Sequence, residues 1–176
     1  MDEPNELGTI AGHGSVRRVE VRRVVSAPIE KVWSALTDPA ELRQWWECDV
    51  LDAREGGRIK LGVGVDGDDC EGTGPDQDGT IKVFMPPHIF EFTWNDDYDD
   101  PGLVRFDLVE FANNTTQVTL VQTLSSTDLL AAAAGWHEIV ERLGVCLDSG
   151  ELVPVPANAA RYRELYAVYE ASRSTV

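Results

Sequence analysis

Two segments in the middle of the chain alternate between apolar and polar side chains. In residues 90–94 and 104–108 every second side chain is large and apolar, namely Phe90, Phe92, Trp94, Val104, Phe106 and Leu108. The side chains between them are polar or charged, as at Glu91 and Asp107. Such alternation is typical of an antiparallel sheet that is buried on one face only. The rest of the chain must therefore provide a cover for that face.

A helix predicted over residues 126–147 is the element long enough to be this cover. Apolar side chains recur along it at helical spacing: Leu129, Ala132, Ala133, Trp136, Val140, Leu143 and Leu147. Gly135 lies inside the helix, where it costs roughly 1 kcal/mol relative to Ala. We therefore expect either a close approach of another backbone at Gly135 or a bend there.

The N-terminal part of the chain predicts one strand followed by two short helices. Residues 16–25 alternate β-branched and charged side chains, and Arg23 falls on the same face as the valines. Residues 28–37 carry an apolar stripe with helical spacing and begin with a proline. Asp38 and Glu41 form a capping box that starts the second helix.

Further elements follow from the same patterns. Residues 58–65, 79–85 and 116–123 are predicted to be strands. After a proline-containing loop, Asn158 can cap a last helix with Tyr and Leu side chains on one face. That face is predicted to pack on the same domain or to form a contact with a second copy of the chain.

Charge and cysteine content limit the function classes. The chain has 15 Lys and Arg against 31 Asp and Glu, a net charge of −16. Such a surface repels phosphate backbones and anionic lipids, so neither a nucleic acid nor a membrane is predicted as a partner. The three Cys form no CxxC pair, and no His stands near them at zinc spacing. We therefore expect a cytoplasmic protein with free thiols, no metal and no cofactor.

The acidic segment of residues 66–78 is a poor match to a calcium-binding loop. Counted from Asp66, Glu71 stands at the sixth position, where an EF-hand loop requires glycine, and Gln77 stands at the twelfth, where it requires glutamate. A solvated hairpin loop is the expected structure, and no metal ligands are predicted.

Two stretches of sequence resemble the SRPBCC, or START-like, superfamily, and within it the branch named for the activator of heat-shock protein 90 ATPase. The first is the run of residues 27–46, which reads APIEKVWSALTDPAELRQWW. The second is Gly135-Trp136-His137 with apolar residues following in helical phase. The resemblance covers roughly residues 16–148. Residues 1–15 are polar and contain glycine, so they are predicted to be a flexible leader, and residues 149–176 are predicted to form a loop and a C-terminal helical extension.

The resemblance implies an α+β helix-grip fold, in which a curved antiparallel sheet wraps around a long C-terminal helix and two short helices follow the first strand. Members of this superfamily bind lipids, sterols, polyketides or plant hormones, and some are aromatase or cyclase enzymes. The namesake co-chaperone contacts a chaperone in the stress response. It also carries an additional large domain that this chain lacks, which makes a chaperone partner the weaker implication.

Nine side chains are candidates for a ligand-binding site between the sheet and the long helix. They are Trp45, Trp46, Phe92, Trp94, Phe106, Leu108, Trp136, Val140 and Arg23. Large rigid rings with few polar groups suit an apolar ligand, although the same rings also suit a filled core. Arg23 is either an anchor for a ligand carboxylate or an end-of-strand side chain that reaches water. If Arg23 is buried, Glu110 is its expected partner.

Catalytic residues are not predicted. His137 is out of phase with the apolar stripe of its helix, so we expect it to be solvated, and no GxSxG or HExxH motif accompanies it. The sequence thus favours non-catalytic binding of a small hydrophobic molecule, lipid-like or polyketide-like. The alternatives are an enzyme of the polyketide cyclase or dehydratase type and a module that contacts a chaperone.

Overall fold

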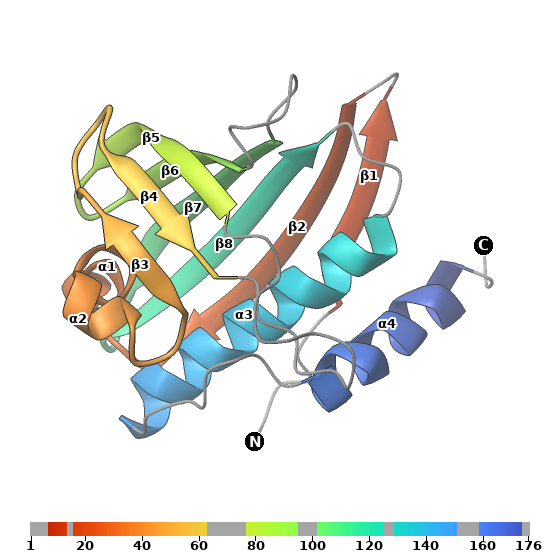
Figure 1. Cartoon of the computed structure of the whole chain (residues 1–176). Helices are drawn as coiled ribbons and strands as arrows, with labels where there is room; N and C mark the ends of the chain where they lie inside the picture. The colour runs from red at the N-terminus through yellow and green to blue at the C-terminus, as the bar shows by residue number, and fades with distance from the viewer. Residues whose placement is uncertain are drawn as a thin grey trace.

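The computed structural model describes residues 7–13, 16–62, 77–94, 102–124, 129–150 and 159–173. These residues form eight strands and four helices, shown in Figure 1. In chain order they are β1 (Thr9–His13), β2 (Val16–Val25), α1 (Ile29–Thr37), α2 (Pro39–Leu42), β3 (Cys48–Leu51), β4 (Arg58–Leu61), β5 (Gln77–Met85), β6 (Ile89–Trp94), β7 (Gly102–Phe111), β8 (Thr115–Leu124), α3 (Leu129–Ser149) and α4 (Ala159–Arg173).

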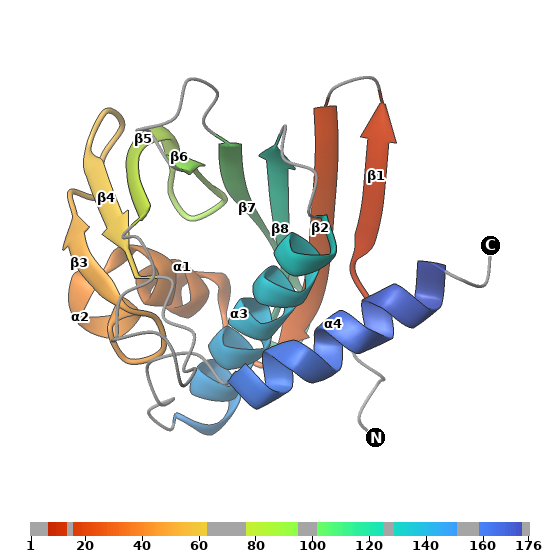
Figure 2. The ribbon, with the colours of Figure 1, turned by 45° about the vertical axis from the view of Figure 1, so that its right-hand side comes forward.

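The strands form one antiparallel sheet in the order β1-β2-β8-β7-β6-β5-β4-β3. The sheet curves, and α3 crosses its concave side, while α4 runs beside α3 (Figures 1 and 2). The predicted α+β helix-grip fold is confirmed, including the two short helices that follow the strand of residues 16–25.

The predicted apolar face of the central strands is the concave face that α3 covers. Phe90 pairs with Phe106 across β6 and β7, and Phe92 pairs with Val104. All four side chains are buried, and each large apolar side chain removed from water contributes about 1.5–3 kcal/mol to folding. The polar residues between them occupy the convex face, where Arg105 bonds to Asp107.

Helix α3 has the predicted apolar stripe, with Ala133, Trp136, Val140 and Leu143 all buried. The expected close approach at Gly135 is wrong for the described residues, because none of their heavy atoms lies within 4 Å of the position a Cβ would take. A close approach does occur at another glycine of this helix, Gly144, which is buried and where an added Cβ would overlap the Arg23 guanidinium.

Three parts of the chain differ from the sequence-based prediction. The prediction of a loose leader is wrong for β1, which pairs with β2 from Thr9–Glu20 to His13–Val16. Strand β3 was not predicted, because its four residues are too few to show a strand pattern and the alternation of Cys48, Asp49 and Val50 ends at Leu51. The predicted strand of residues 58–65 ends at Leu61 in β4, and residues 63–65 lie outside the described residues.

The last predicted helix is present as α4 and packs on its own chain. Leu165 and Tyr169 are buried, and Tyr162 and Tyr166 are half-buried against the same core. The predicted cap Asn158 lies outside the described residues, as do residues 126–128 ahead of α3. Among the described helices, none is long and apolar enough to cross a membrane.

The surroundings of the two glycines in α3 lead to a prediction about stability. We expect Gly135→Ala to raise the free energy of unfolding by up to about 1 kcal/mol, because alanine has the higher helix propensity and the methyl group meets no described atom. Gly144→Ala is the matched control and should lower it, because its methyl group would displace Arg23. Urea denaturation of both variants measures the difference. Destabilisation by Gly135→Ala would contradict the prediction.

Candidate functional site

Four tryptophans from three separate segments meet between the sheet and α3. Trp45 and Trp46 follow α2, Trp94 ends β6, and Trp136 lies on α3. The ring centres of Trp46 and Trp136 are 5.7 Å apart, and those of Trp94 and Trp136 are 5.0 Å apart. Trp45 lies 5.5 Å from Trp46. We call these four residues the tryptophan cluster.

Phenylalanines on the concave face continue the tryptophan cluster across the sheet. The Phe92 ring lies 6.3 Å from Trp94 and 5.1 Å from Phe90, and Phe90 stacks on Phe106 at 6.5 Å. Tilted and edge-to-face rings at these distances attract each other beyond simple burial. The structure therefore brings together six of the nine candidate residues.

Leu108 and Val140 belong to the same buried core as these rings. Leu108 is paired with Val118 of β8 on the concave face, and Val140 lies one helical turn beyond Trp136. Both side chains are fully covered. They extend the apolar floor of the candidate site and bring no polar group to it.

Three of the four indole N–H groups of the tryptophan cluster fix their rings in place by hydrogen bonds. Trp45 Nε1 donates to the Ala35 carbonyl at 3.0 Å, and Trp46 Nε1 donates to the Gly62 carbonyl at 3.2 Å. Trp136 Nε1 donates to the side chain of Gln122 at 2.6 Å. These bonds tie the cluster to α1, to the end of β4 and to β8. Gln122 lies at an even-numbered position of β8, like the inward-facing Val118 and Leu120. The alternation of the strand could therefore have placed Gln122 on the concave face.

A buried ion pair on α3 holds the segment that carries Trp45. Arg142 donates from Nε to the Trp45 carbonyl at 2.9 Å, and its Nη1 lies 3.5 Å from Glu138 Oε1. Both side chains are buried. The sequence did not indicate this pair. Both residues lie outside the apolar stripe of the helix, and the spacing of apolar residues does not show that another segment covers them.

Arg23 does not join the tryptophan cluster. Its guanidinium lies between β2 and α3 beside Gly144, and Nη2 is 3.7 Å from Asp148 Oδ2. The expectation of Glu110 as its partner is wrong, because Glu110 is exposed and Asp148 takes that place. The side chain is 24% exposed, which agrees with the expectation that it reaches water, although its Nε is enclosed without a hydrogen-bond partner.

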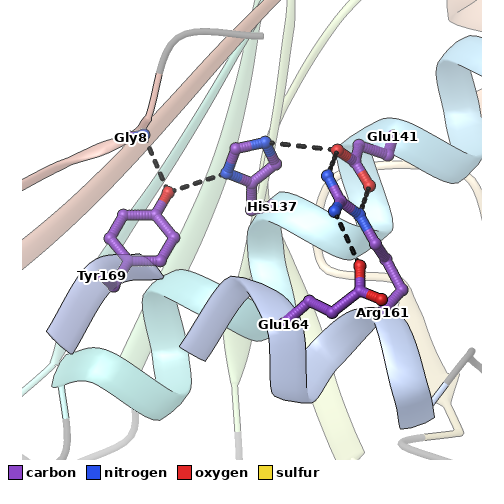
Figure 3. Close-up of polar contacts among 6 residues, drawn as sticks. All are labelled: Gly8, His137, Glu141, Arg161, Glu164 and Tyr169. Atoms are coloured by element: carbon purple, nitrogen blue, oxygen red, sulfur yellow. Dashed lines mark hydrogen bonds and ion pairs between the residues drawn. The ribbon is translucent and has the colours of Figure 1, made fainter. Parts of the chain in front are cut away.

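A second polar group links α3, α4 and the start of β1, as Figure 3 shows. His137 is 1% exposed, so the prediction of a solvated histidine is wrong. Its Nδ1 lies 2.9 Å from the Tyr169 hydroxyl, which accepts the Gly8 N–H at 2.7 Å. Helix α4 covers His137, and the pattern of α3 alone does not reveal that cover.

Glu141 extends this network toward the beginning of α4. Its two carboxylate oxygens accept bonds from Arg161 at 2.6 and 2.8 Å, and Arg161 also reaches Glu164 at 3.1 Å (Figure 3). These hydrogen bonds raise the pKa of Arg161 further above its ordinary value. The network holds α4 against α3 and uses groups remote from the tryptophan cluster.

The donors around Tyr169 determine the protonation of His137. The Tyr169 oxygen accepts from Gly8, and among the described residues His137 Nδ1 is the acceptor within reach of the hydroxyl proton, which assigns Nδ1 as unprotonated. Neutral His137 therefore carries its proton on Nε2, 3.5 Å from Glu141 Oε1. Burial lowers the pKa of His137; Glu141 opposes this effect, whereas Arg161 and Arg23 add to it.

The described residues contain no group of three or more His, Cys, Asp or Glu side chains that could hold a metal ion. The acidic segment of residues 66–76 lies outside the described residues. Cys48 and Cys146 are free, and burial raises the pKa of both thiols, which keeps them protonated and weakly reactive. Cys70 is also outside the described residues.

The curved sheet, the crossing helix and the apolar residues between them define a helix-grip protein of the START-like class. The model of the family "Activator of Hsp90 ATPase homolog 1-like protein" matches residues 26–148, and the chain belongs to this family. Strands β1 and β2 and helix α4 lie outside the matched residues. No curated protein matches the chain.

Several solved structures have the same fold. The solution structure of CalU16 from Micromonospora echinospora is 22% identical and has a TM-score of 0.72, with 99% of each chain covered. A conserved protein of unknown function, EF2215 from Enterococcus faecalis, is 19% identical with a TM-score of 0.68 and covers 94% of this chain and 91% of its own. DynU16, described as a putative protein in the dynemicin biosynthetic locus, is 23% identical with a TM-score of 0.64 and covers 77% of this chain and 48% of its own.

The lowered pKa of His137 predicts a pH dependence of stability. Below about pH 6.5 the unfolded chain takes up a proton that the folded chain resists, so the free energy of unfolding falls as the pH falls from 7.5 to 5.5. The contribution of His137 to this slope is at most about 1.4 kcal/mol per pH unit. Denaturant unfolding at several pH values measures it.

Two histidine variants separate this effect from other titrating groups. His137→Asn keeps an acceptor near the Tyr169 hydroxyl but cannot take up a proton, so its slope should be smaller over this range. His88→Asn, at an exposed turn between β5 and β6, should keep the wild-type slope. Equal slopes for wild type and His137→Asn would mean that His137 does not cause the pH dependence.

Proposed function

We propose that this protein binds a small apolar molecule at the tryptophan cluster without covalent chemistry. The observation that carries the proposal is the meeting of four indole rings from three distant segments between the sheet and α3. The START-like fold and the family support it, since they are compatible with binding of small hydrophobic molecules.

The chemistry of the cluster favours an apolar and rigid ligand. Three of its four indole N–H groups, those of Trp45, Trp46 and Trp136, are already committed to protein acceptors, so these rings offer their faces rather than polar edges. Aromatic faces give large contact areas at a small cost in side-chain entropy. Trp94 is half-buried, so the cluster is not fully covered by the protein. A lipid-like or polyketide-like molecule fits these surroundings.

The relatives provide weaker support for the ligand class. The description of DynU16 places that protein in the dynemicin biosynthetic locus, which agrees with binding of a small molecule. At 23% identity the likeness carries the fold alone, so the ligand class rests on the cluster. We further propose that residues 16–148 form the binding unit and that the protein acts in the cytoplasm.

An enzyme of the cyclase type is the second candidate, and one observation favours it. Such chemistry needs polar groups beside the apolar ligand, and Glu138 and Arg142 form a buried ion pair whose Arg142 Nε bonds the Trp45 carbonyl. The pair is already matched internally, which suits a supporting role better than proton transfer. Binding without turnover therefore remains the leading proposal.

Binding of the neutral dye N-phenyl-1-naphthylamine tests the proposal. We expect its fluorescence to rise on addition of wild-type protein, with a dissociation constant in the micromolar range. Trp94→Ala should weaken binding by about tenfold, because it removes a half-buried ring that contacts Trp46 and Trp136. No rise in fluorescence up to the solubility limit of the dye would overturn the proposal.

Trp33→Ala is the matched control for this experiment. Trp33 contacts Phe84 and Phe90 at the other end of the aromatic residues and is also half-buried. Its removal should change dye affinity by less than about twofold while costing comparable stability. An equal loss of affinity in Trp33→Ala and Trp94→Ala would show that the dye responds to general loosening of the core.

A further inference from the structure

Gln122 is a polar side chain within the apolar concave face. It lies on β8 between Val19 of β2 and Val104 of β7, its register partners on either side. Both valines are buried, and Gln122 itself is only 4% exposed. On the same face of β8, Leu120 and Val118 follow at every second position. A polar amide at this place requires hydrogen-bond partners.

The hydrogen bond to Trp136 fixes the orientation of the amide. An indole nitrogen can only donate, so the Gln122 atom that lies 2.6 Å from Trp136 Nε1 must be the carbonyl oxygen, Oε1. The usual uncertainty between the oxygen and the nitrogen of a glutamine amide is thereby removed. The two N–H groups of Nε2 must point away from Trp136.

Within the described part of the chain, the Gln122 side chain makes one hydrogen bond, the bond from Trp136 to its Oε1. No acceptor among these residues binds Gln122 Nε2. The nitrogen is also not sealed inside the protein, since Arg23 Nε is the one described side-chain atom that is both enclosed and unpaired. A Cβ added to Gly102 would lie 3.7 Å from Nε2, so this donor is near the start of β7, where Gly102 pairs with Trp94.

We propose that Gln122 Nε2 donates a hydrogen bond to a carbonyl oxygen of the bound ligand. The inference rests on the proposed function and adds a chemical class to it: a flat apolar molecule with an uncharged carbonyl group. Trp136 and Trp94 flank the donor and offer ring faces to the apolar part, while Trp136 holds the amide in its donating orientation. Gln122 is thus a specificity-determining residue of the site.

The charges around Gln122 favour a neutral acceptor over a carboxylate. Two arginines of β2 share the inward parity of Val19. Arg17 lies two residues along the strand from Val19, which places its backbone about 7 Å from the register position of Gln122, and it already has an interaction partner in the chain. Arg23 lies four residues along, about 13 Å from that position. Its guanidinium is already directed to Asp148. A carboxylate at Nε2 would lose its hydration beside arginines that already have partners, in a chain with a net charge of −16, and that loss is unfavourable.

Two ligands of nearly identical shape test the inference. The ketone 2-acetylnaphthalene has a carbonyl oxygen where the hydrocarbon 2-isopropenylnaphthalene has a methylene group. Their dissociation constants are measured by displacement of N-phenyl-1-naphthylamine from the full chain. We expect the wild-type protein to bind the ketone about 3- to 10-fold more tightly, the range for one neutral hydrogen bond. It should bind the anion 2-naphthoate more weakly than the ketone.

A pair of glutamine variants assigns the preference to Gln122. Gln122→Met keeps the length of the side chain but has no donor, so the two ligands should bind equally. Gln117→Met is the control on the same strand; Gln117 faces the other side of the sheet, where its Nε2 donates to Thr119 Oγ1. This variant should keep the wild-type preference for the ketone.

The outcomes separate this inference from the proposed function. Equal wild-type affinity for ketone and hydrocarbon, or tighter binding of 2-naphthoate, would overturn the inference while leaving binding at the tryptophan cluster intact. Displacement by neither ligand in a protein that also fails to bind the dye would overturn both. The wild-type comparison decides the inference even if Gln122→Met, which leaves Trp136 Nε1 without an acceptor, does not fold.

Discussion

Packing of α3 into the concave face of the sheet is the interaction on which the rest of the structure depends. A curved sheet with one apolar face and a single long helix leaves few ways to exclude water. The helix must lie across the strands of the concave face, where its backbone comes closest to β2 and its Trp136 meets Trp94 of β6. Because the sheet curves away from a straight helix, large rings occupy the space between them, and Trp136 lies among these rings.

Three sides of α3 face different segments of the chain, and each side has a polar side chain bonded to the segment that it faces. Trp136 faces the sheet, and its indole bonds Gln122. Arg142 and Glu138 hold the segment after α2, and His137 and Glu141 hold α4. A helix that is covered on several sides cannot use water to satisfy its charges, so each of these side chains has a protein partner. The same helix therefore positions the candidate site and attaches the segments that surround it.

The sequence contained enough information to predict β6, β7 and the apolar stripe of α3, because alternation and helical periodicity record which side of an element meets the core. It did not reveal the burial of His137 or Arg142, since a polar residue outside the stripe has the same pattern whether water or another segment covers it. Strand β1 was missed for a related reason: an edge strand with one neighbour needs little apolar alternation. Gln122 could have been found by strand parity, but its function depends on a tertiary contact with Trp136.

The hydrogen bond between Gly8 and Tyr169 joins residues that are 161 positions apart in the chain. This bond connects the segment just before β1 to helix α4, so the first and last described segments of the chain lie in contact. Closing so large a loop costs chain entropy, and contacts of this separation form only after much of the intervening chain has folded. The two terminal segments are thus mutually dependent: trimming either end to the residues matched by the family would remove the support of the other end and expose the buried side of α3 that carries His137.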